Sequence, residues 1–487
     1  MNDLKKEMSL PHIPKEDRKT ILLLSDDIRL HSGIATMAKE IVLGTSHRFN
    51  WVNLGAALKH PDAGKRIDLS DSVNKEAGIE DASVILYPNN GYGDANILRH
   101  LMKTENPSMI FHFTDPRYWV WLYQMEREVR SQIPISYLNI WDDYPTPLYN
   151  KNYYDSCDLL MGISKQTVNI NKLVLGDNAQ DKVIEYVPHG INEDKFRSVN
   201  IDDEIELGEF TQFKTKVLGG KEYDFIVLFN SRNIRRKSPG DVILSYRQFC
   251  DQIGKEKAKR CALVMHTQPV DNNGTDLHAV KEAICDPEYV NVHFSATKLD
   301  TKQMNFLYNM ADATMLISSN EGWGLSLTES MMAGTMIIAN VTGGMQDQMR
   351  FVDDNGDWYT PSKEVPSNHM GTYKECGKFA VPVFPSNISL VGSVPTPYIH
   401  DDRCDFRDVA NAIQEVYELS PEDREERGVA AREWVTSKES QMSARHMCDN
   451  IIDCIEKTFE TFKPRKSFEF IKIEEQKPAY VQHAMVY

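Results

Sequence analysis

The chain has 487 residues, of which 41% are hydrophobic, so it is long enough and apolar enough for two or three globular domains. Its 55 basic and 71 acidic residues give a formal net charge of −16, which argues against indiscriminate binding to nucleic acid or to anionic membranes. The cysteines include no C-x-x-C pair, which favours neither a zinc site nor a disulfide framework and fits a reducing cytoplasm. No stretch approaches the length of a membrane span, and residues 1–19 lack the apolar core of a signal peptide.

The first half of the chain alternates short apolar runs with helical segments. The first run, residues 19–25, is predicted to be a buried strand, and a helix through about Leu43 follows it. Further strands are predicted at 82–88, 109–112, 135–141, 159–163 and 183–187. This alternation predicts a parallel sheet with helical crossovers, which is a Rossmann-like domain. The G-x-G turn at 91–93 lacks the third glycine of a dinucleotide fingerprint, which argues against NAD.

Two strand ends in this half combine aromatic side chains with ionisable groups. The residues concerned are His112, Asp115, Trp141, Asp142, Asp143 and Tyr144. The carboxyl ends of parallel strands form the edge at which open α/β sheets bind ligands. The aspartates are therefore candidates for hydrogen bonds to a ligand hydroxyl or for a general base. Capping of the helices that follow is an equally good explanation for them.

The second half begins after a polar segment. The first domain is predicted to span residues 1–197, with a linker at 198–222 that is charged and interrupted by two glycines. A second domain, 223–440, is predicted to contain strands at 224–229, 261–266 and 290–294 and helices at 302–310, 406–419 and around Trp434. Residues 351–403 are rich in proline, glycine and aromatic residues and exceed ordinary loop lengths, which predicts a functional segment.

The most informative stretch is 318–334, which lies between predicted strands at 313–317 and 336–339. Gly322 and Gly324 allow a sharp turn, and residues 325–333 have helical spacing with a glycine as the stop. Glu321 is thereby predicted on the loop after a strand, and Glu329 on the following helix, facing the same crevice. Backbone amides at a helix start suit phosphate, and carboxylates suit sugar hydroxyls, so the stretch predicts a nucleotide-sugar site.

This stretch resembles the retaining glycosyltransferases of the GT-B fold, and within them the group called family four. The resemblance is carried by the spacing of Glu321 and Glu329, by the patterns S-x-x-E-G-x-G and E-x-x-x-x-G, and by T-G-G at 342–344. It implies an α/β architecture of two Rossmann-like domains whose parallel sheets face a central cleft. It also implies that residues 441–487 form a C-terminal helix that crosses back to the first domain, followed by a tail.

The resemblance further implies roles for individual residues. Arg232 and Lys237 would hold the donor diphosphate, Glu329 the ribose hydroxyls and Glu321 the sugar hydroxyls. The full donor-binding set is Gly33, Arg232, Lys237, Glu321, Gly322, Gly324, Leu325 and Glu329. The catalytic set is His112, Asp115 and Glu321, and the acceptor-side set is Trp141, Asp142, Asp143 and Tyr144. The remaining cations of this run, Arg235 and Arg236, fit a solvated face or a polyanion contact.

The chain contains no D-x-D motif, so sugar transfer is expected to need neither a metal ion nor another cofactor. The resemblance implies retention of anomeric configuration by a front-face mechanism, which requires no enzyme nucleophile. Fixed cations would stabilise the charge that develops on the leaving diphosphate. Three other activities remain open on the same fold: a nucleotide-sugar epimerase, a sugar-phosphate synthase and an idle binding module.

The acceptor has two readings. One is a saccharide, a lipid or a small metabolite. The other follows from residues 113–119 and 140–145, which resemble bacteriophage glycosyltransferases that add glucose or arabinose to hydroxymethylated cytosine in DNA. Aromatic side chains would stack on an extruded base, and basic residues at 232–237 and 463–466 would contact phosphates, although the net charge of −16 counts against it. The expected partners are a nucleotide-sugar and, in this reading, DNA in the host cytoplasm.

Overall fold

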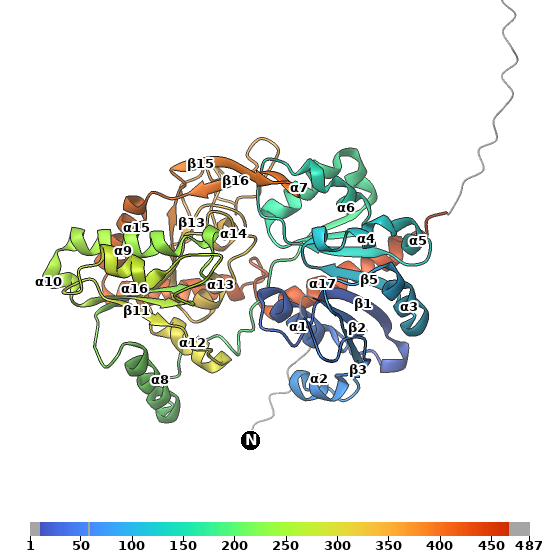
Figure 1. Ribbon diagram of the computed structural model, residues 1–487, viewed down its shortest axis with the longest axis horizontal. Coiled ribbons are helices and arrows are strands. Elements are labelled where there is room, and N and C mark those ends of the chain that lie inside the picture. The colour runs from blue at the N-terminus through green and yellow to red at the C-terminus, as the bar shows by residue number, and fades with distance from the viewer. Residues whose placement is uncertain (1–9, 57–58, 467–487) are drawn as a thin grey trace, which may run out of the picture.

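The computed structural model describes residues 10–56 and 59–466. The end of the predicted tail, 467–487, and residues 1–9 of the N-terminal stretch considered above lie outside the described residues, as do 57–58. The chain forms two α/β domains, each with its own sheet, that lie side by side (Figure 1). The prediction of two Rossmann-like domains with parallel sheets is confirmed.

The first domain is built on an eight-stranded sheet with the order β3-β4-β2-β1-β5-β6-β7-β8. Its strands are β1 Lys19–Asp26, β2 Phe49–Ala56, β3 Ile67–Asp68, β4 Val84–Pro88, β5 Met109–Phe113, β6 Ile135–Asn139, β7 Leu159–Gly162 and β8 Val183–Tyr186. Its helices are α1 Gly33–Thr45, α2 Ser70–Ala77, α3 Ala95–Glu105, α4 Val120–Gln124, α5 Glu126–Arg130, α6 Lys151–Asp155 and α7 Lys165–Leu175. In β1, residues 21–24 are all fully buried, because helices cover both faces of a parallel sheet.

The second domain is built on a six-stranded sheet with the order β11-β10-β9-β12-β13-β14. Its strands are β9 Phe225–Asn230, β10 Cys261–His266, β11 Val292–Ser295, β12 Ala313–Leu316, β13 Met336–Asn340 and β14 Ala380–Val383. Its helices are α9 Pro239–Ile253, α10 Lys255–Ala258, α11 Leu277–Ile284, α12 Thr301–Asn309, α13 Leu325–Met332, α14 Met345–Met349, α15 Phe406–Glu418 and α16 Pro421–Thr436. Both sheets direct the carboxyl ends of their central strands toward the other domain.

One central strand, β2, is absent from the sequence-based prediction although it pairs with β1 along its whole length. Its apolar run is interrupted by asparagines, which lowers its apparent hydrophobicity. The structure explains one of them, since Asn53 is fully buried and its Nδ2 donates to the carbonyl of Leu23 at 3.3 Å. A buried amide that finds a backbone partner is tolerated inside a sheet.

The segment predicted as a linker contains a helix, α8 (Glu204–Val217). Asp203 caps this helix by accepting hydrogen bonds from two backbone amides. Phe210 and Phe213 pack on Phe306 of α12, with ring centroids 5.6 and 6.0 Å apart. Most of its other residues are polar or charged and exposed, which explains why its composition resembles a linker.

The long segment 351–403 also contains regular structure. It supplies β14, the edge strand of the second sheet, and an antiparallel hairpin formed by β15 (Asn387–Ser393) and β16 (Thr396–Arg403). Figure 1 shows this hairpin lying over the junction of the two domains, near α7. The hairpin therefore belongs to the interface rather than to either sheet.

The last helix, α17 (Ala444–Thr461), returns to the first domain and packs on α1, β7 and β8 (Figure 1). The crossing is fixed by backbone hydrogen bonds, because Ile191 N donates to the carbonyl of Met442 and Ala444 N donates to the carbonyl of Ile191. Helix α17 is thereby built into the first domain.

Candidate functional site

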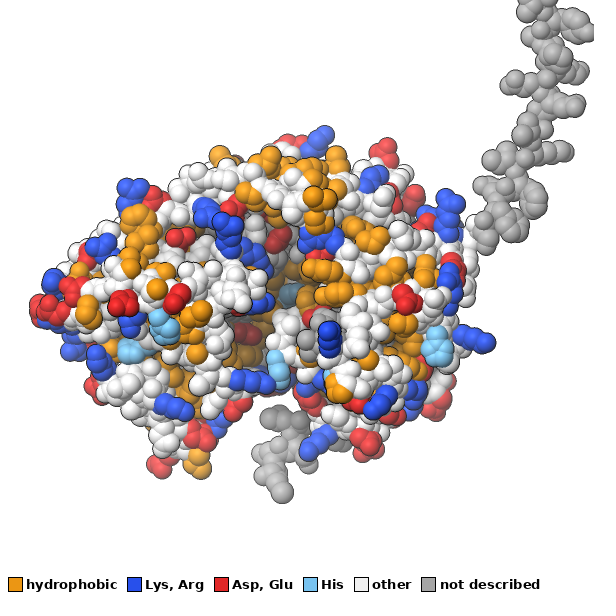
Figure 2. Space-filling model, in the orientation of Figure 1, with side chains coloured by type: hydrophobic (Ala, Val, Ile, Leu, Met, Phe, Trp, Pro, Cys, Tyr) orange, Lys and Arg blue, Asp and Glu red, His pale blue; other side chains and the backbone are white. Residues whose placement is uncertain are grey.

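The candidate site lies in the cleft between the domains, where Figure 2 shows the surface hollowed. The two domains approach each other closely at this cleft. A Cβ added to Gly322 would lie 3.0 Å from the carbonyl oxygen of Ile140, and one added to Gly33 would lie 3.3 Å from Leu325 Cδ1. The glycines therefore let the second domain approach β6 and α1 of the first closely.

Glu321 is the centre of the charged groups in the cleft. Its carboxylate contacts the ammonium of Lys237 and lies 3.2 Å from Arg236 Nη1. The same guanidinium donates to the carbonyl of Asn320 at 2.7 Å. Lys237 and Glu321 are 8% and 9% exposed, so this pair is shielded from water yet faces the cleft. Two cations held beside one carboxylate form a site suited to a diphosphate and a sugar hydroxyl.

Arg232 lies outside this group. Its side chain is 65% exposed, and its Nε lies 3.2 Å from Asp271 Oδ2. Arg236, and not Arg232, lies beside Lys237 at Glu321. Sequence reasoning missed Arg236 because the run of three basic residues does not reveal which side chain turns inward; the short 3₁₀ helix Arg235–Lys237 decides it.

Glu329 lies on α13, as the spacing predicts, and it faces α12. Tyr308 Oη donates to its Oε2 at 2.5 Å, and Asn230 Nδ2 donates to the same tyrosine oxygen at 2.6 Å. Burial raises the pKa of Glu329 to about 7, although the hydrogen bond from Tyr308 opposes the rise. The carboxyl group is therefore held in position but only half ionised at neutral pH.

The loop around Glu321 is fixed by glycines. Gly324, with φ of +84°, precedes α13, and Gly344 N donates to the carbonyl of Glu321 at 3.0 Å. Gly343 has φ of +52°, and a Cβ there would lie 2.0 Å from the same carbonyl oxygen. The T-G-G motif thus packs against the backbone of Glu321 and holds its loop in position.

We expect Gly343→Ala to destabilise the protein and to displace Glu321. Left-handed backbone costs alanine about 1–2 kcal/mol, and the clash adds about 1–3 kcal/mol. The matched control is Gly356→Ala, since Gly356 also has positive φ but an added Cβ would meet no atom within 4 Å. Urea unfolding of both variants measures the difference, and equal losses would contradict the contact.

On the acceptor side, Asp142 lies near enough to Arg236 and Lys237 to feel their positive charges. Burial raises its pKa, while the positive charges of Arg236 and Lys237 pull it down. Its carbonyl accepts a hydrogen bond from Gln166 Nε2 at 2.8 Å, and the carbonyl of Trp141 accepts one from Thr167 Oγ1 at 2.7 Å. The start of α7 therefore holds this loop in place.

Asp143 and Tyr144 turn away from the cleft. Asp143 is 1% exposed, and its Oδ1 accepts a hydrogen bond from Tyr144 N at 2.7 Å. Burial and the negative charge of Asp402 raise the pKa of Asp143 well above its usual range. Tyr144 Oη accepts a hydrogen bond from Asn169 at 2.9 Å. Their contacts fix the loop rather than present groups to a ligand.

His112 and Asp115 are engaged within the first domain. His112 is fully buried, its Nδ1 lies 2.6 Å from Tyr123 Oη, and burial lowers its pKa to about 3. Asp115 accepts hydrogen bonds from the backbone amide and side chain of Arg117 at 3.0 and 2.9 Å, which makes it a cap. The structure does not bring either side chain to Glu321, so their catalytic role stays a prediction.

The β15–β16 hairpin covers this acceptor-side loop. Sequence reasoning missed this contact. Tyr149 Oη donates to the carbonyl of Tyr398 at 2.8 Å, and His400 N donates to the carbonyl of Tyr144 at 2.7 Å. Arg117 contacts Thr396. Because these bonds join segments about 250 residues apart, local sequence patterns do not predict them.

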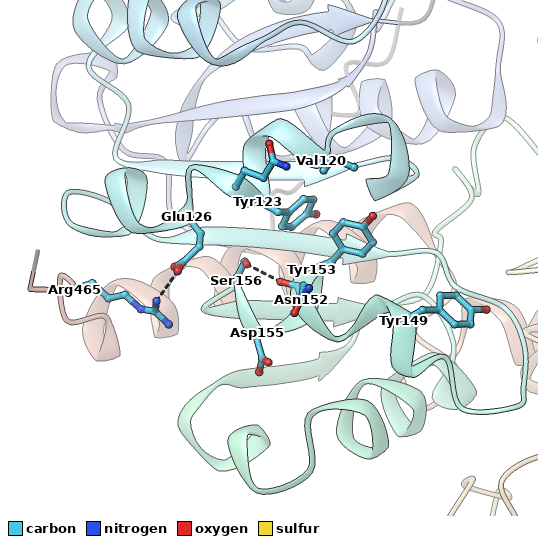
Figure 3. A pocket seen from close by; sticks show the side chains of 10 residues that line it. Val120, Tyr123, Glu126, Tyr149, Asn152, Tyr153, Asp155, Ser156 and Arg465 are labelled. Carbon is cyan, nitrogen blue, oxygen red and sulfur yellow. Dashed lines mark hydrogen bonds and ion pairs between the residues drawn. The ribbon is translucent and has the colours of Figure 1, made fainter. Parts of the chain in front are cut away.

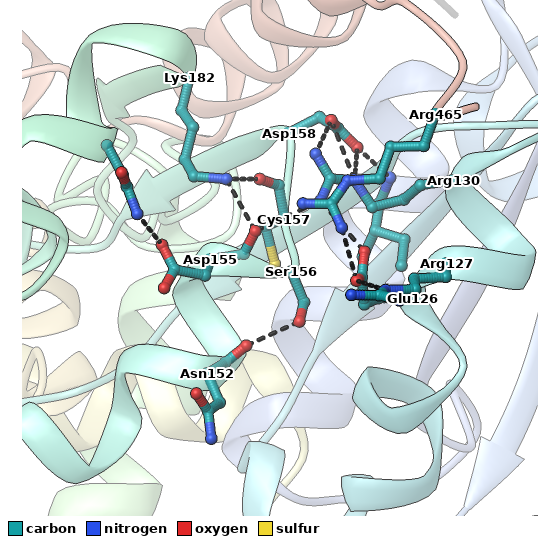
Figure 4. Close-up of polar contacts among 12 residues, drawn as sticks. Glu126, Arg127, Arg130, Asn152, Asp155, Ser156, Cys157, Asp158, Lys182 and Arg465 are labelled. Atoms are coloured by element: carbon teal, nitrogen blue, oxygen red, sulfur yellow. Dashed lines mark hydrogen bonds and ion pairs between the residues drawn. The ribbon is translucent and has the colours of Figure 1, made fainter. Parts of the chain in front are cut away.

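A pocket of about 430 Å³ opens behind the loop, on the first domain (Figure 3). Tyr123, Tyr149 and Tyr153 supply its aromatic wall. Arg465 closes one side through an ion pair to Glu126 at 2.6 Å. Figure 4 shows that Arg130, Asp158 and Glu126 belong to the same network, so Arg465 shares the carboxylate of Glu126 with Arg130.

Comparisons with known proteins bear on this site. Residues 211–363, which include Lys237, Glu321 and Glu329, match the family described as Glycosyl transferases group 1. The Anabaena protein HepE in complex with UDP and glucose superposes with a TM-score of 0.60 at 11% identity, over 90% of this chain and 100% of that one. Sucrose-phosphate synthase of Thermosynechococcus elongatus gives 0.62 at 14%, over 91% and 100%.

The fold is GT-B. An α,α-trehalose 6-phosphate synthase of Burkholderia multivorans shares it with a TM-score of 0.60 at 10% identity, over 91% of this chain and 99% of that chain. No curated protein sequence matches the chain. Together, the matched family region and this GT-B fold support a transferase. In the described part of the chain, no helix has the length and apolar character to cross a membrane.

Proposed function

We propose that the protein transfers a sugar from a nucleotide-diphosphate sugar to a hydroxyl group, with retention of anomeric configuration and without a metal ion or cofactor in the transfer step. The observation that carries the proposal is the cluster of Lys237 and Arg236 on Glu321, opposite Asp142. The second domain binds the donor, whose ribose hydroxyls donate to Glu329. The HepE structures contain UDP or UDP-glucose, which makes a uridine diphosphate sugar the first donor to test.

In this mechanism, the bond between the anomeric carbon and the diphosphate oxygen breaks while the acceptor oxygen attacks the same face of the sugar. The acceptor proton passes to the departing phosphate oxygen, and Asp142 holds the acceptor hydroxyl. Lys237 and Arg236 stabilise the charge that develops on the diphosphate. Contact between the domains excludes water, which limits hydrolysis of the donor. Nuclear magnetic resonance of the product tests this mechanism, since an inverted anomeric centre would exclude retention.

For the acceptor, we propose 5-hydroxymethylcytosine in DNA. The supporting observation is an aromatic pair on the first domain, where Tyr118 is 56% exposed and stacks on the half-buried Tyr92 at 4.6 Å. Such a pair suits a base taken out of the duplex. Lys463 is exposed and available for phosphate contacts, whereas Arg465 is paired with Glu126.

The experiment is mass spectrometry of nucleosides from duplex DNA containing 5-hydroxymethylcytosine, after incubation with the protein and nucleotide-activated hexoses and pentoses. The expected result is a hexose or pentose mass on that nucleoside. The matched control is the same duplex with 5-methylcytosine, which lacks the hydroxyl. No addition, with donor binding demonstrated by calorimetry, would overturn the DNA acceptor and direct the search to saccharides. An isomerised donor would instead indicate an epimerase.

A further inference from the structure

Three metal-ligating side chains converge behind the donor loop. They are His369, His400 and Asp402, and one ligand atom from each lies within 4.8 Å of the other two. His369 Nδ1 lies 3.1 Å from Asp402 Oδ2, and the same oxygen accepts a hydrogen bond from Thr342 Oγ1 at 2.7 Å. Asp402 is fully buried, and the two histidines are half-buried.

Several polar atoms in this cluster lack partners among the described residues. Asp402 Oδ1 and His400 Nδ1 are buried without a hydrogen bond, and so is Oδ2 of the neighbouring Asp143. Leaving such atoms unpaired costs about 1–3 kcal/mol each, and native structures rarely accept it. A cation would provide the missing partner for the unpaired atoms of Asp402 and His400.

We propose that His369, His400 and Asp402 bind a divalent transition-metal ion of the zinc class. Two imidazole nitrogens and a carboxylate oxygen form a ligand set suited to Zn²⁺. Tetrahedral coordination with bonds of about 2.1 Å places ligand atoms about 3.4 Å apart. In the structure the ligand atoms lie within 4.8 Å of one another, with His369 Nδ1 and Asp402 Oδ2 3.1 Å apart, so side-chain rotations bring them to this spacing. Thr342 Oγ1, 2.7 Å from Asp402 Oδ2, is a further oxygen beside the cluster.

The backbone around the cluster indicates what the ion would do. Asp402 N donates to the carbonyl of Ser319 at 2.9 Å, and Asn320 Nδ2 donates to the carbonyl of His400 at 3.2 Å. His400 N donates to the carbonyl of Tyr144. The ion would thus join the hairpin to the loop of Glu321 and to the acceptor-side loop. Because Asp402 is fully buried, the ion braces the site and takes no part in the transfer step.

The test uses the full-length protein after chelation and dialysis, titrated with Zn²⁺ in a calorimeter. We expect one equivalent to bind and to raise the melting temperature. Asp402→Asn keeps the size of the side chain and should lower the affinity at least about 100-fold. His100→Ala is the matched control, since His100 lies exposed on α3, and it should bind as the unaltered protein does. Equal binding by all three proteins would overturn the proposal.

A second measurement does not depend on the variants folding. Co²⁺ added to the unaltered protein should give the visible absorption of a four- or five-coordinate ion with nitrogen and oxygen ligands. A thiolate-to-cobalt charge-transfer band would show that a cysteine, such as nearby Cys404, holds the ion and would overturn the assignment. Absence of any bound-ion spectrum would overturn it as well. Neither readout requires sugar-transfer activity, so failure of this proposal is distinguishable from failure of the proposed function.

Discussion

Replacing Lys237 by methionine is expected to lower kcat/KM for sugar transfer about 10²- to 10³-fold, the usual cost of removing one preorganised group that stabilises developing charge. Lys237 is 8% exposed and faces the cleft beside Glu321. Its ammonium is therefore shielded from water. Its attraction to negative charge at the position proposed for the diphosphate is correspondingly strong. Steady-state kinetics with the identified donor and acceptor measure the effect.

The matched control is Arg235→Met, because Arg235 lies in the same short 3₁₀ helix but is exposed. We expect less than about a twofold change for this variant, since an exposed cation contributes little in water. Arg236 still pairs with Glu321 when Lys237 is absent, so the variant is expected to fold. Thermal unfolding verifies this. Equal losses of activity in the two folded variants would show that net positive charge, not the position of Lys237, supports the reaction.

Replacing Glu329 by alanine is expected to weaken donor binding about 10- to 100-fold, because hydrogen bonds to a charged group contribute about 1.5–3 kcal/mol. The fold should persist, since Glu329 is only partly buried. Calorimetry with the nucleotide-sugar measures the affinity. Glu204→Ala, on the exposed α8, is the control. Unchanged donor affinity in Glu329→Ala would exclude its contact with the ribose.

Donor binding should also depend on pH through the same carboxyl group. Its pKa in the free protein is about 7, and ribose hydroxyls donate to its ionised form. Affinity should therefore rise about tenfold between pH 6 and pH 8, following the ionised fraction. Glu329→Gln cannot ionise, so its affinity should not follow this rise. An equal rise in the variant would assign the titration to another group.

The contribution of Glu329 to the free energy of unfolding should fall over the pH range in which donor affinity rises. A carboxyl group whose pKa is raised on folding holds more protons in the folded than in the unfolded state. Its contribution to the free energy of unfolding is therefore present below its unfolded pKa and is lost as pH rises toward about 7. Relative to the unaltered protein, Glu329→Gln should become more stable from pH 5 to pH 8. Together with weaker donor binding, this gain would show that Glu329 serves donor binding at a cost in stability.

The local pattern around Glu321 was predictable because it depends on short-range rules. Glycines that turn the chain, apolar runs on either side and helical spacing after Gly324 all act within about twenty residues. The same rules place Glu329 on α13 and Lys237 after β9, and the structure brings Lys237 to Glu321. Apolar alternation likewise predicted both sheets, since buried parallel strands require continuous apolar runs.

The remaining site could not be predicted from local pattern. His112 lies near the carboxyl end of β5, where a ligand-binding residue would lie, yet aromatic side chains of the first domain enclose it. Arg232 pairs with Asp271, and Arg236 takes the inward position, because the direction of a side chain in a tight turn depends on partners distant in sequence. The hairpin over the acceptor loop is held by bonds across the domain interface.

The sequence by itself therefore determined the two α/β domains, the glycine-rich loop and the carboxylates with a nucleotide-sugar pattern, because these depend on periodicity and backbone conformation. Only the tertiary structure decided which cations meet Glu321, what covers the acceptor loop and which buried groups gather around Asp402. Those features depend on contacts between segments tens to hundreds of residues apart. Such contacts form only when packing of the two sheets fixes the positions of their loops.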